Sequence, residues 1–203
     1  MNININTHSS IQIDDLAFDP YGITDTNFKA KYIFITHTHF DHLDIESIKN
    51  IIQKDSTIIA PTDAKKVLEE NFDNKIFYVL PKDEVNLHEI KVEVFASYNI
   101  DKHFHPKENN WVGYKVTKDE KVFAVLGDTD ATPELEELSS IDVLFVPIGG
   151  TYTMNAIEAA HLANKIKPEL VVPVHYGSIV GTKEDEQTFI SNLNPEINYK
   201  IML

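Results

Sequence analysis

The residues from His37 to His42 read His-Thr-His-Phe-Asp-His, so three imidazoles and one carboxylate stand within six consecutive positions. A strand-to-loop turn can direct alternate side chains of such a run the same way. His37 and His39 can then share one ion, while Asp41 and His42 can reach a second ion a few Å away. This spacing is typical of sites in which two metals share and activate one water molecule, and it indicates hydrolytic chemistry.

The chain contains no cysteine, which restricts the kind of metal site it can build. Disulfides, thiolate nucleophiles and sulfur ligands are excluded, and histidines and carboxylates are the only strong metal ligands left. A set of nitrogen and oxygen donors suits Zn²⁺, Mn²⁺ or Fe²⁺ and does not decide among them. We expect two divalent metal ions as cofactors, with zinc as the first choice.

Composition and charge limit the class of protein. A length of 203 residues predicts one domain, residues 1–203. No apolar run approaches the roughly 20 residues that cross a bilayer, and the first residues lack the basic flank of a signal peptide, so we expect a cytoplasmic protein. The formal net charge of −14 argues against nucleic acid or a membrane as partner and leaves a small-molecule substrate. Nothing in the sequence indicates an oligomeric state.

Short runs rich in β-branched and aromatic residues alternate with segments of helical periodicity, which predicts an α/β fold. The predicted strands are residues 11–18, 32–35, 57–59, 75–79, 91–95, 112–116, 122–126, 143–146, 170–174 and 199–202. The predicted helices are residues 45–53, 62–71, 133–138, 155–166 and 184–193. A hairpin turn is predicted at residues 117–120.

Chemically active residues come just past the ends of four predicted strands. These residues are Asp19, His37, Asp128 and His175. Apolar strands that end in metal-type ligands build a site at the rim of a sheet, where rigid elements position the ligands and loops vary around them. The sequence therefore predicts that these side chains serve a common site.

The run from His37 to His42 matches the His-x-His-x-Asp-His signature of the metallo-β-lactamase superfamily, which the chain resembles over nearly its whole length. The resemblance implies a four-layer αβ/βα sandwich of the metallo-β-lactamase type. Further segments resemble a branch of small metal-dependent hydrolases related to ascorbate-phosphate lactonase. They are Tyr98-Asn99, His105-Pro106, Gly113-Tyr114 and residues 147–154.

The resemblance also implies the ligand set. One metal would be held by His37, His39 and His105, the other by Asp41, His42 and His175, and Asp128 would bridge the two. His103 is the alternative to His105. We prefer His105 because a proline follows it and because His105 comes just before the strand that carries Gly113. Asp19 would support a metal-binding histidine by accepting its second ring N–H.

The activity implied is hydrolysis, with a hydroxide bound by two metals attacking a small ester, lactone or phosphodiester. Asp41 and Asp128 would be the catalytic carboxylates, Asp41 by orienting the nucleophile and Asp128 by joining the ions. The absence of cysteine argues against a penicillin substrate. His39 stands where redox members of the superfamily carry glutamate, which argues against oxygen or nitric oxide reduction.

The alternative from another class is a non-catalytic, metal-containing binding or carrier module on the same fold. The complete ligand set speaks against it, because decayed sites usually lack ligands, although a fold never guarantees an activity. A closed structural metal site is a weaker alternative, since such sites are typically cysteine-rich. The other histidines, His8, His88 and His161, have no partner motif, and we interpret them as ordinary polar or packing residues.

Overall fold

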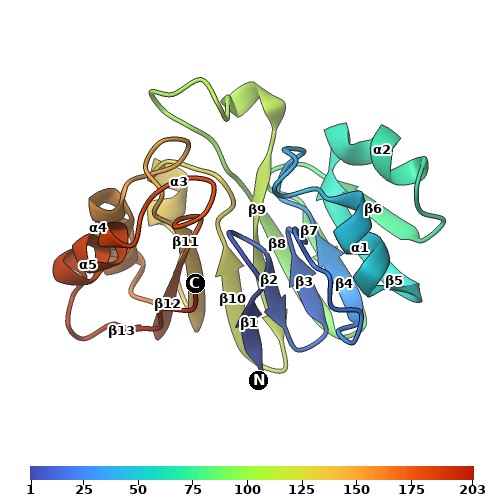
Figure 1. Ribbon diagram of the computed structural model, residues 1–203, viewed down its shortest axis with the longest axis horizontal. Helices are drawn as coiled ribbons and strands as arrows, with labels where there is room; N and C mark the ends of the chain where they lie inside the picture. Colours follow the sequence, from blue (N-terminus) through green and yellow to red (C-terminus); the bar gives the residue numbers. More distant parts are fainter. The chain divides into compact units, whose positions relative to one another are not determined.

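The computed structural model describes residues 1–203, which fall into two compact units, residues 1–79 with Leu203 and residues 80–202 (Figure 1). Each unit contains one β-sheet with both parallel and antiparallel pairs, together with helices. The α/β class predicted from the alternation of strand and helix patterns is therefore confirmed. The single domain of residues 1–203 stays a prediction.

The first unit has a six-stranded sheet in which the strands lie in the order they have along the chain. They are β1 (Ile3–Ile5), β2 (Ile11–Ile13), β3 (Leu16–Phe18), β4 (Ala30–Phe34), β5 (Ile52–Pro61) and β6 (Lys75–Val79). The pairs from β1 to β3 are antiparallel, and those from β3 to β6 are parallel. The helices are α1 (Ile45–Ile51), the 3₁₀ turn η1 (Thr62–Ala64) and α2 (Lys65–Glu69).

The predicted strand over residues 11–18 is wrong, because the segment forms a hairpin of two three-residue strands, β2 and β3. Ile13 pairs with Leu16 across the turn, and Asp14 adopts a positive φ of 49°. Aspartate tolerates this left-handed conformation better than most residues, so Asp14-Asp15 can form a two-residue turn. The apolar runs on either side are too short to be told apart from one continuous strand.

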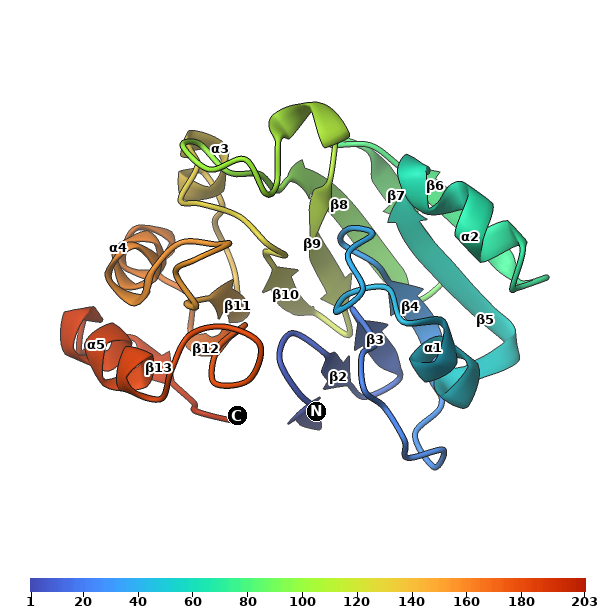
Figure 2. The ribbon, with the colours of Figure 1, turned by 45° about the horizontal axis from the view of Figure 1, so that its top comes forward.

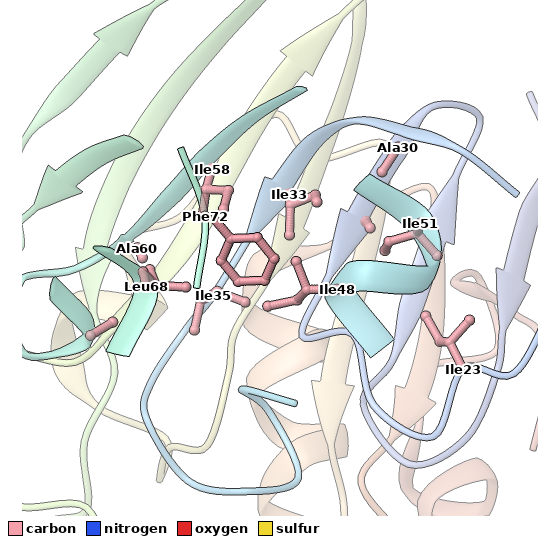
Figure 3. Close-up of a cluster of buried hydrophobic side chains, with 12 residues drawn as sticks. Ile23, Ala30, Ile33, Ile35, Ile48, Ile51, Ile58, Ala60, Leu68 and Phe72 are labelled. Atoms are coloured by element: carbon pink, nitrogen blue, oxygen red, sulfur yellow. The ribbon is translucent and has the colours of Figure 1, made fainter. Parts of the chain in front are cut away.

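The core of the first unit lies between α1, α2 and one face of the sheet (Figure 3). Ile48 and Ile51 of α1 are one helical turn apart and both fully buried, as the periodicity of an amphipathic helix requires. They pack with Ile33 and Ile58 from the neighbouring strands β4 and β5. Helix α1 ends at Ile51, and not at the predicted residue 53, because β5 begins at the next residue.

The second unit has a seven-stranded sheet in the order β13-β12-β11-β10-β9-β8-β7. The strands are β7 (Glu84–Asn86), β8 (Ile90–Ala96), β9 (Val112–Lys118), β10 (Lys121–Val125), β11 (Val143–Pro147), β12 (Leu170–Val174) and β13 (Asn198–Tyr199). Pairs from β7 to β10 are antiparallel, and pairs from β10 to β13 are parallel. The predicted hairpin turn is confirmed, with Asp119 and Glu120 at positive φ between β9 and β10.

The helices of the second unit are η2 (Lys107–Asn109), α3 (Pro133–Glu136), α4 (Ala156–Ile166) and α5 (Glu184–Asn192). Helix α4 starts with a capping box, in which the Asn155 side chain accepts from the Glu158 amide and Glu158 accepts from the Asn155 amide. It packs on β11 and on α5 (Figure 2). None of the helices combines the length and apolarity that a membrane crossing requires.

Truncation of Ile48 tests this account of the first core. Ile48→Ala should lower the free energy of unfolding by about 2–5 kcal/mol, because a fully buried side chain leaves a cavity between α1 and the sheet. Ile157→Ala, at a position 44% exposed on α4, is the control and should cost less than about 0.5 kcal/mol. Urea unfolding with a chelator present measures both, and equal losses in the two variants would contradict the assignment.

Candidate metal centre

The parallel pairing of β3 and β4 places the predicted residues of the first unit at one edge of its sheet. Phe18 and Phe34 are aligned at the carboxyl ends of these strands, and the Asp19 amide donates to the Phe34 carbonyl over 2.9 Å. Asp19 is fully buried and has a positive φ of 44°. The run His37 to His42 follows β4 at the same edge.

Asp19 fixes the orientation of His42. The Thr36 amide donates to Asp19 Oδ1 over 2.7 Å, and the Thr36 hydroxyl donates to Asp19 Oδ2 over 2.7 Å. His42 Nδ1 lies 2.8 Å from the same Oδ2. Because an ionised carboxylate only accepts, His42 carries its proton on Nδ1, and its Nε2 lone pair is available to a metal.

Thr36 links Asp19 to His37 and fixes the orientation of that histidine as well. Its hydroxyl proton is committed to Asp19, so its oxygen accepts from His37 Nδ1, which lies 3.0 Å away. The Nε2 lone pair of His37 is thereby also kept for a metal. That Nε2 lies 3.1 Å from His39 Nδ1, a separation at which both nitrogens can bind one ion.

Asp41 lies beside two imidazoles in the first unit. Its Oδ2 is 3.7 Å from His42 Nε2 and 3.2 Å from His8 Nε2. His8, interpreted from the sequence as an ordinary polar or packing residue, is fully buried next to a predicted site residue. No sequence signal separates His8 from His88, which the structure leaves exposed.

Parallel strands also position the predicted residues of the second unit. Strands β10, β11 and β12 run parallel, so Asp128 after β10 and His175 after β12 emerge at the same edge. Asp128 Oδ2 lies 2.8 Å from His175 Nε2 and 3.3 Å from His105 Nε2. All three side chains are buried.

The structure separates the two histidines between which the sequence left a choice. His105 Nδ1 lies 3.2 Å from both Asn99 Oδ1 and the Tyr152 carbonyl, which are acceptors, so this nitrogen carries the proton and Nε2 faces Asp128. His103 is exposed and lies against the ring of Phe104. Asn99, which fixes His105, had no role assigned from the sequence.

His175 is held in a strained backbone conformation, with a positive φ of 60°. The Ile148 amide donates to the Val174 carbonyl just before it, and Gly149 packs against its backbone. A Cβ at Gly149 would lie 2.3 Å from the His175 carbonyl oxygen, so only glycine fits there. Burial raises the pKa of the next residue, Tyr176, and Glu186 raises it further, so its phenol stays neutral beside His175.

Each unit thus gathers donors whose chemistry fits a divalent metal ion. They are imidazole nitrogens and carboxylate oxygens, they are mostly buried, and no sulfur is among them. Three of the imidazoles are fixed through Nδ1 by Asp19, Thr36 or Asn99, which is how metal-binding histidines are usually oriented.

Comparison with known proteins gives the class of protein. The family model of the β-lactamase superfamily domain matches residues 4–175. A metal-dependent hydrolase, provisionally named as such, from Parabacteroides distasonis has a crystal structure with a TM-score of 0.86 and 29% identity, covering 98% of this chain and 91% of that one. The metallo-β-lactamase type of fold predicted from the sequence is confirmed.

Two curated relatives narrow the class. A UPF0173 protein of Pyrococcus furiosus is 31% identical over 178 residues, which is 84% of this chain and 81% of the relative. A UPF0173 metal-dependent hydrolase of Bacillus velezensis is 29% identical over 220 residues, covering 95% and 92% of the two chains. The chain belongs to the β-lactamase superfamily and, within it, to the UPF0173 family of metal-dependent hydrolases.

The role of Asp19 can be tested with a nearly isosteric change. Asp19→Asn should weaken metal binding by about 10–100-fold, because an amide can no longer accept all three hydrogen bonds while fixing His42. Asparagine tolerates a positive φ as aspartate does, so backbone strain would not explain the loss. Competition with a chromogenic chelator measures the affinity. Asp73→Asn, at an exposed position, is the control, and equal affinities in the two variants would contradict this role.

A small polar cluster lies on the chain close to His105. Glu134 accepts from the Lys107 ammonium and from the Tyr98 hydroxyl, each over 2.8 Å. Hydrogen bonds from Lys107 and Tyr98 lower the pKa of Glu134 from 4.5 to about 2. The native state is therefore favoured by this ionised carboxylate above pH 4.5, and the stabilisation is lost as the pH falls towards 2.

Glu134→Gln should remove that part of the pH dependence. Because the side chains are half exposed, we expect a loss below about 1 kcal/mol at neutral pH, and the two stability curves should converge as the pH falls below 4.5. Thermal unfolding from pH 7 to 2, with chelator present to remove metal effects, checks this. Curves that stay parallel throughout would contradict it.

Proposed function

We propose that residues 1–203 work as one cytoplasmic, binuclear metal-dependent hydrolase domain acting on a small ester, lactone or phosphodiester. The observation that carries the proposal is the set of imidazoles whose Nδ1 atoms are fixed by Asp19, Thr36 and Asn99. Such hydrogen bonds keep the Nε2 lone pairs for a metal. Membership of a family of metal-dependent hydrolases supports the reaction type.

The proposed ligands are those expected from the sequence. One ion would be held by His37, His39 and His105, the other by Asp41, His42 and His175, with Asp128 as the bridge. Distances within each unit support ligands that share an ion. His37 Nε2 lies 3.1 Å from His39 Nδ1, and Asp128 Oδ2 lies 2.8 Å from His175 Nε2. Zinc is our first choice of metal, with manganese or iron as the others that this donor set suits.

Two divalent ions, when bound, lower the pKa of a shared water and polarise the electrophile of the substrate. The protein contributes orientation and proton handling. Asp19 and Thr36 keep His42 and His37 in the tautomers that bind metal. Asp41 presents a carboxylate that can orient the attacking water and accept its proton.

An open depression lies next to Thr38 and Phe40 of the histidine run and is large enough for a small molecule. It has a volume of about 540 Å³, within the range of ligand sites for small molecules. Its lining combines polar, apolar and charged side chains, namely Thr38, Phe40, Leu43, Asp63, Lys66, Val67 and Glu70. The net charge of −14 disfavours a polyanionic polymer as substrate.

Metal content is the first test. Protein purified without chelator or affinity-column metal should carry about two Zn, Mn or Fe ions per chain by elemental analysis, as two-metal hydrolysis requires. His37→Ala/His39→Ala should lower this number, because it removes two ligands of one ion. His88→Ala, which removes an exposed histidine, should leave it unchanged. Absence of metal from the wild-type protein would overturn the proposal.

A panel of chromogenic esters, lactones and phosphodiesters separates an enzyme from a carrier. The metal-loaded wild type should hydrolyse at least one class, and Asp128→Asn should lower kcat/KM by roughly 100-fold or more, because the proposed bridging carboxylate is lost. Two tightly bound metals without turnover on any member of the panel would instead favour the non-catalytic binding or carrier module.

A further inference from the structure

We propose that His8 is a further metal ligand, which binds the same ion as Asp41 and His42. This inference rests on the proposed metal centre and adds a residue to it. The ligand atoms offered by His8, Asp41 and His42 lie within 4.8 Å of one another. Nitrogen and oxygen atoms bound to one ion at about 2.0–2.2 Å are themselves roughly 3–4 Å apart, so small side-chain movements would complete the coordination.

The lone pairs of this cluster argue for a cation. His42 carries its proton on Nδ1, where Asp19 accepts it, so its Nε2 presents a lone pair toward Asp41 Oδ2 at 3.7 Å. His8 Nε2 approaches the same oxygen to 3.2 Å. A divalent ion placed among these atoms would be attracted by the carboxylate and would accept the imidazole lone pair. In the ligand set proposed above this ion already has His42 and His175, so His8 would be its third imidazole.

The backbone around His8 is built to hold this side chain inward. In the turn between β1 and β2, the Asn6 amide donates to the Ser10 carbonyl and the Ser10 amide donates to the Thr7 carbonyl. The Ser10 hydroxyl also accepts from the Tyr21 amide over 3.1 Å. His8 is thereby kept at a φ of 53° with its ring fully buried. Such a conformation is uncommon outside glycine and persists where surrounding structure enforces it, often at functional sites.

The rival role for His8 is that of a positioning residue that donates a hydrogen bond to Asp41. Two substitutions distinguish the roles without disturbing the turn, because glycine and asparagine both tolerate a positive φ. His8→Asn keeps an N–H donor that could reach Asp41 but loses the imidazole. His8→Gly removes the side chain and leaves space that free imidazole can enter.

The experiment measures metal bound per chain after dialysis, together with the visible absorption of the Co²⁺-loaded protein. If His8 is a ligand, both variants should lose about one ion of two, or bind it at least roughly 10-fold more weakly, with a changed Co²⁺ spectrum. Added imidazole should restore binding to His8→Gly only. His88→Gly, with and without imidazole, is the matched control for the loss of an exposed histidine.

The outcomes separate the two proposals. Wild-type metal content, affinity and Co²⁺ spectrum in His8→Asn would assign His8 to positioning and overturn this inference while leaving the metal centre intact. A wild-type protein that binds no metal would overturn the proposed function, and this inference with it. Thermal unfolding of the metal-free proteins should show that both variants are still folded at the temperature of the binding experiment, so that lost binding is not lost folding.

Discussion

The buried carboxylate of Asp19 is the interaction on which the site in the first unit depends. It accepts from the amide and hydroxyl of Thr36 and from His42, and these partners offset the cost of burying a charge. They come together because β3 and β4 are parallel neighbours whose ends are aligned. The pairing of two short strands therefore decides the tautomers of two histidines.

The second unit applies the same rule with different residues. Parallel β10, β11 and β12 bring Asp128 and His175 to one edge, and Asn99 takes the orienting part for His105. In both units the end of a strand determines the position of a proposed ligand residue. A polar side chain then determines which nitrogen of a histidine is available to a metal. The strands thus position the residues that follow them, and these residues carry the chemistry.

Local patterns in the sequence predicted most of the fold and part of the site. Most of the strands and helices, the α4 segment and the β9–β10 turn follow from periodicity and turn residues. The histidine run and the residues at strand ends indicated a metal site, and the resemblance to the metallo-β-lactamase superfamily implied the full ligand set. The β2–β3 hairpin, the partnership of His8 with Asp41 and the clamp of Asn99 on His105 were not predicted. The contact between His8 and Asp41 depends on how segments distant in the chain pair, which residue types alone do not encode. The hairpin and the Asn99 contact are local, but they depend on turn conformations that a short run of residue types does not specify.

Three residues of these clusters, His8, Asp19 and His175, share the left-handed backbone conformation. At such positions glycine would relieve backbone strain, but it would also remove a buried side chain. For Asp19 the change would leave the Thr36 amide and hydroxyl without their acceptor, so the relief of strain would not raise the stability of the protein. Each of these positions is thus constrained twice, by the backbone conformation it must adopt and by the side chain it must present, which leaves few acceptable substitutions.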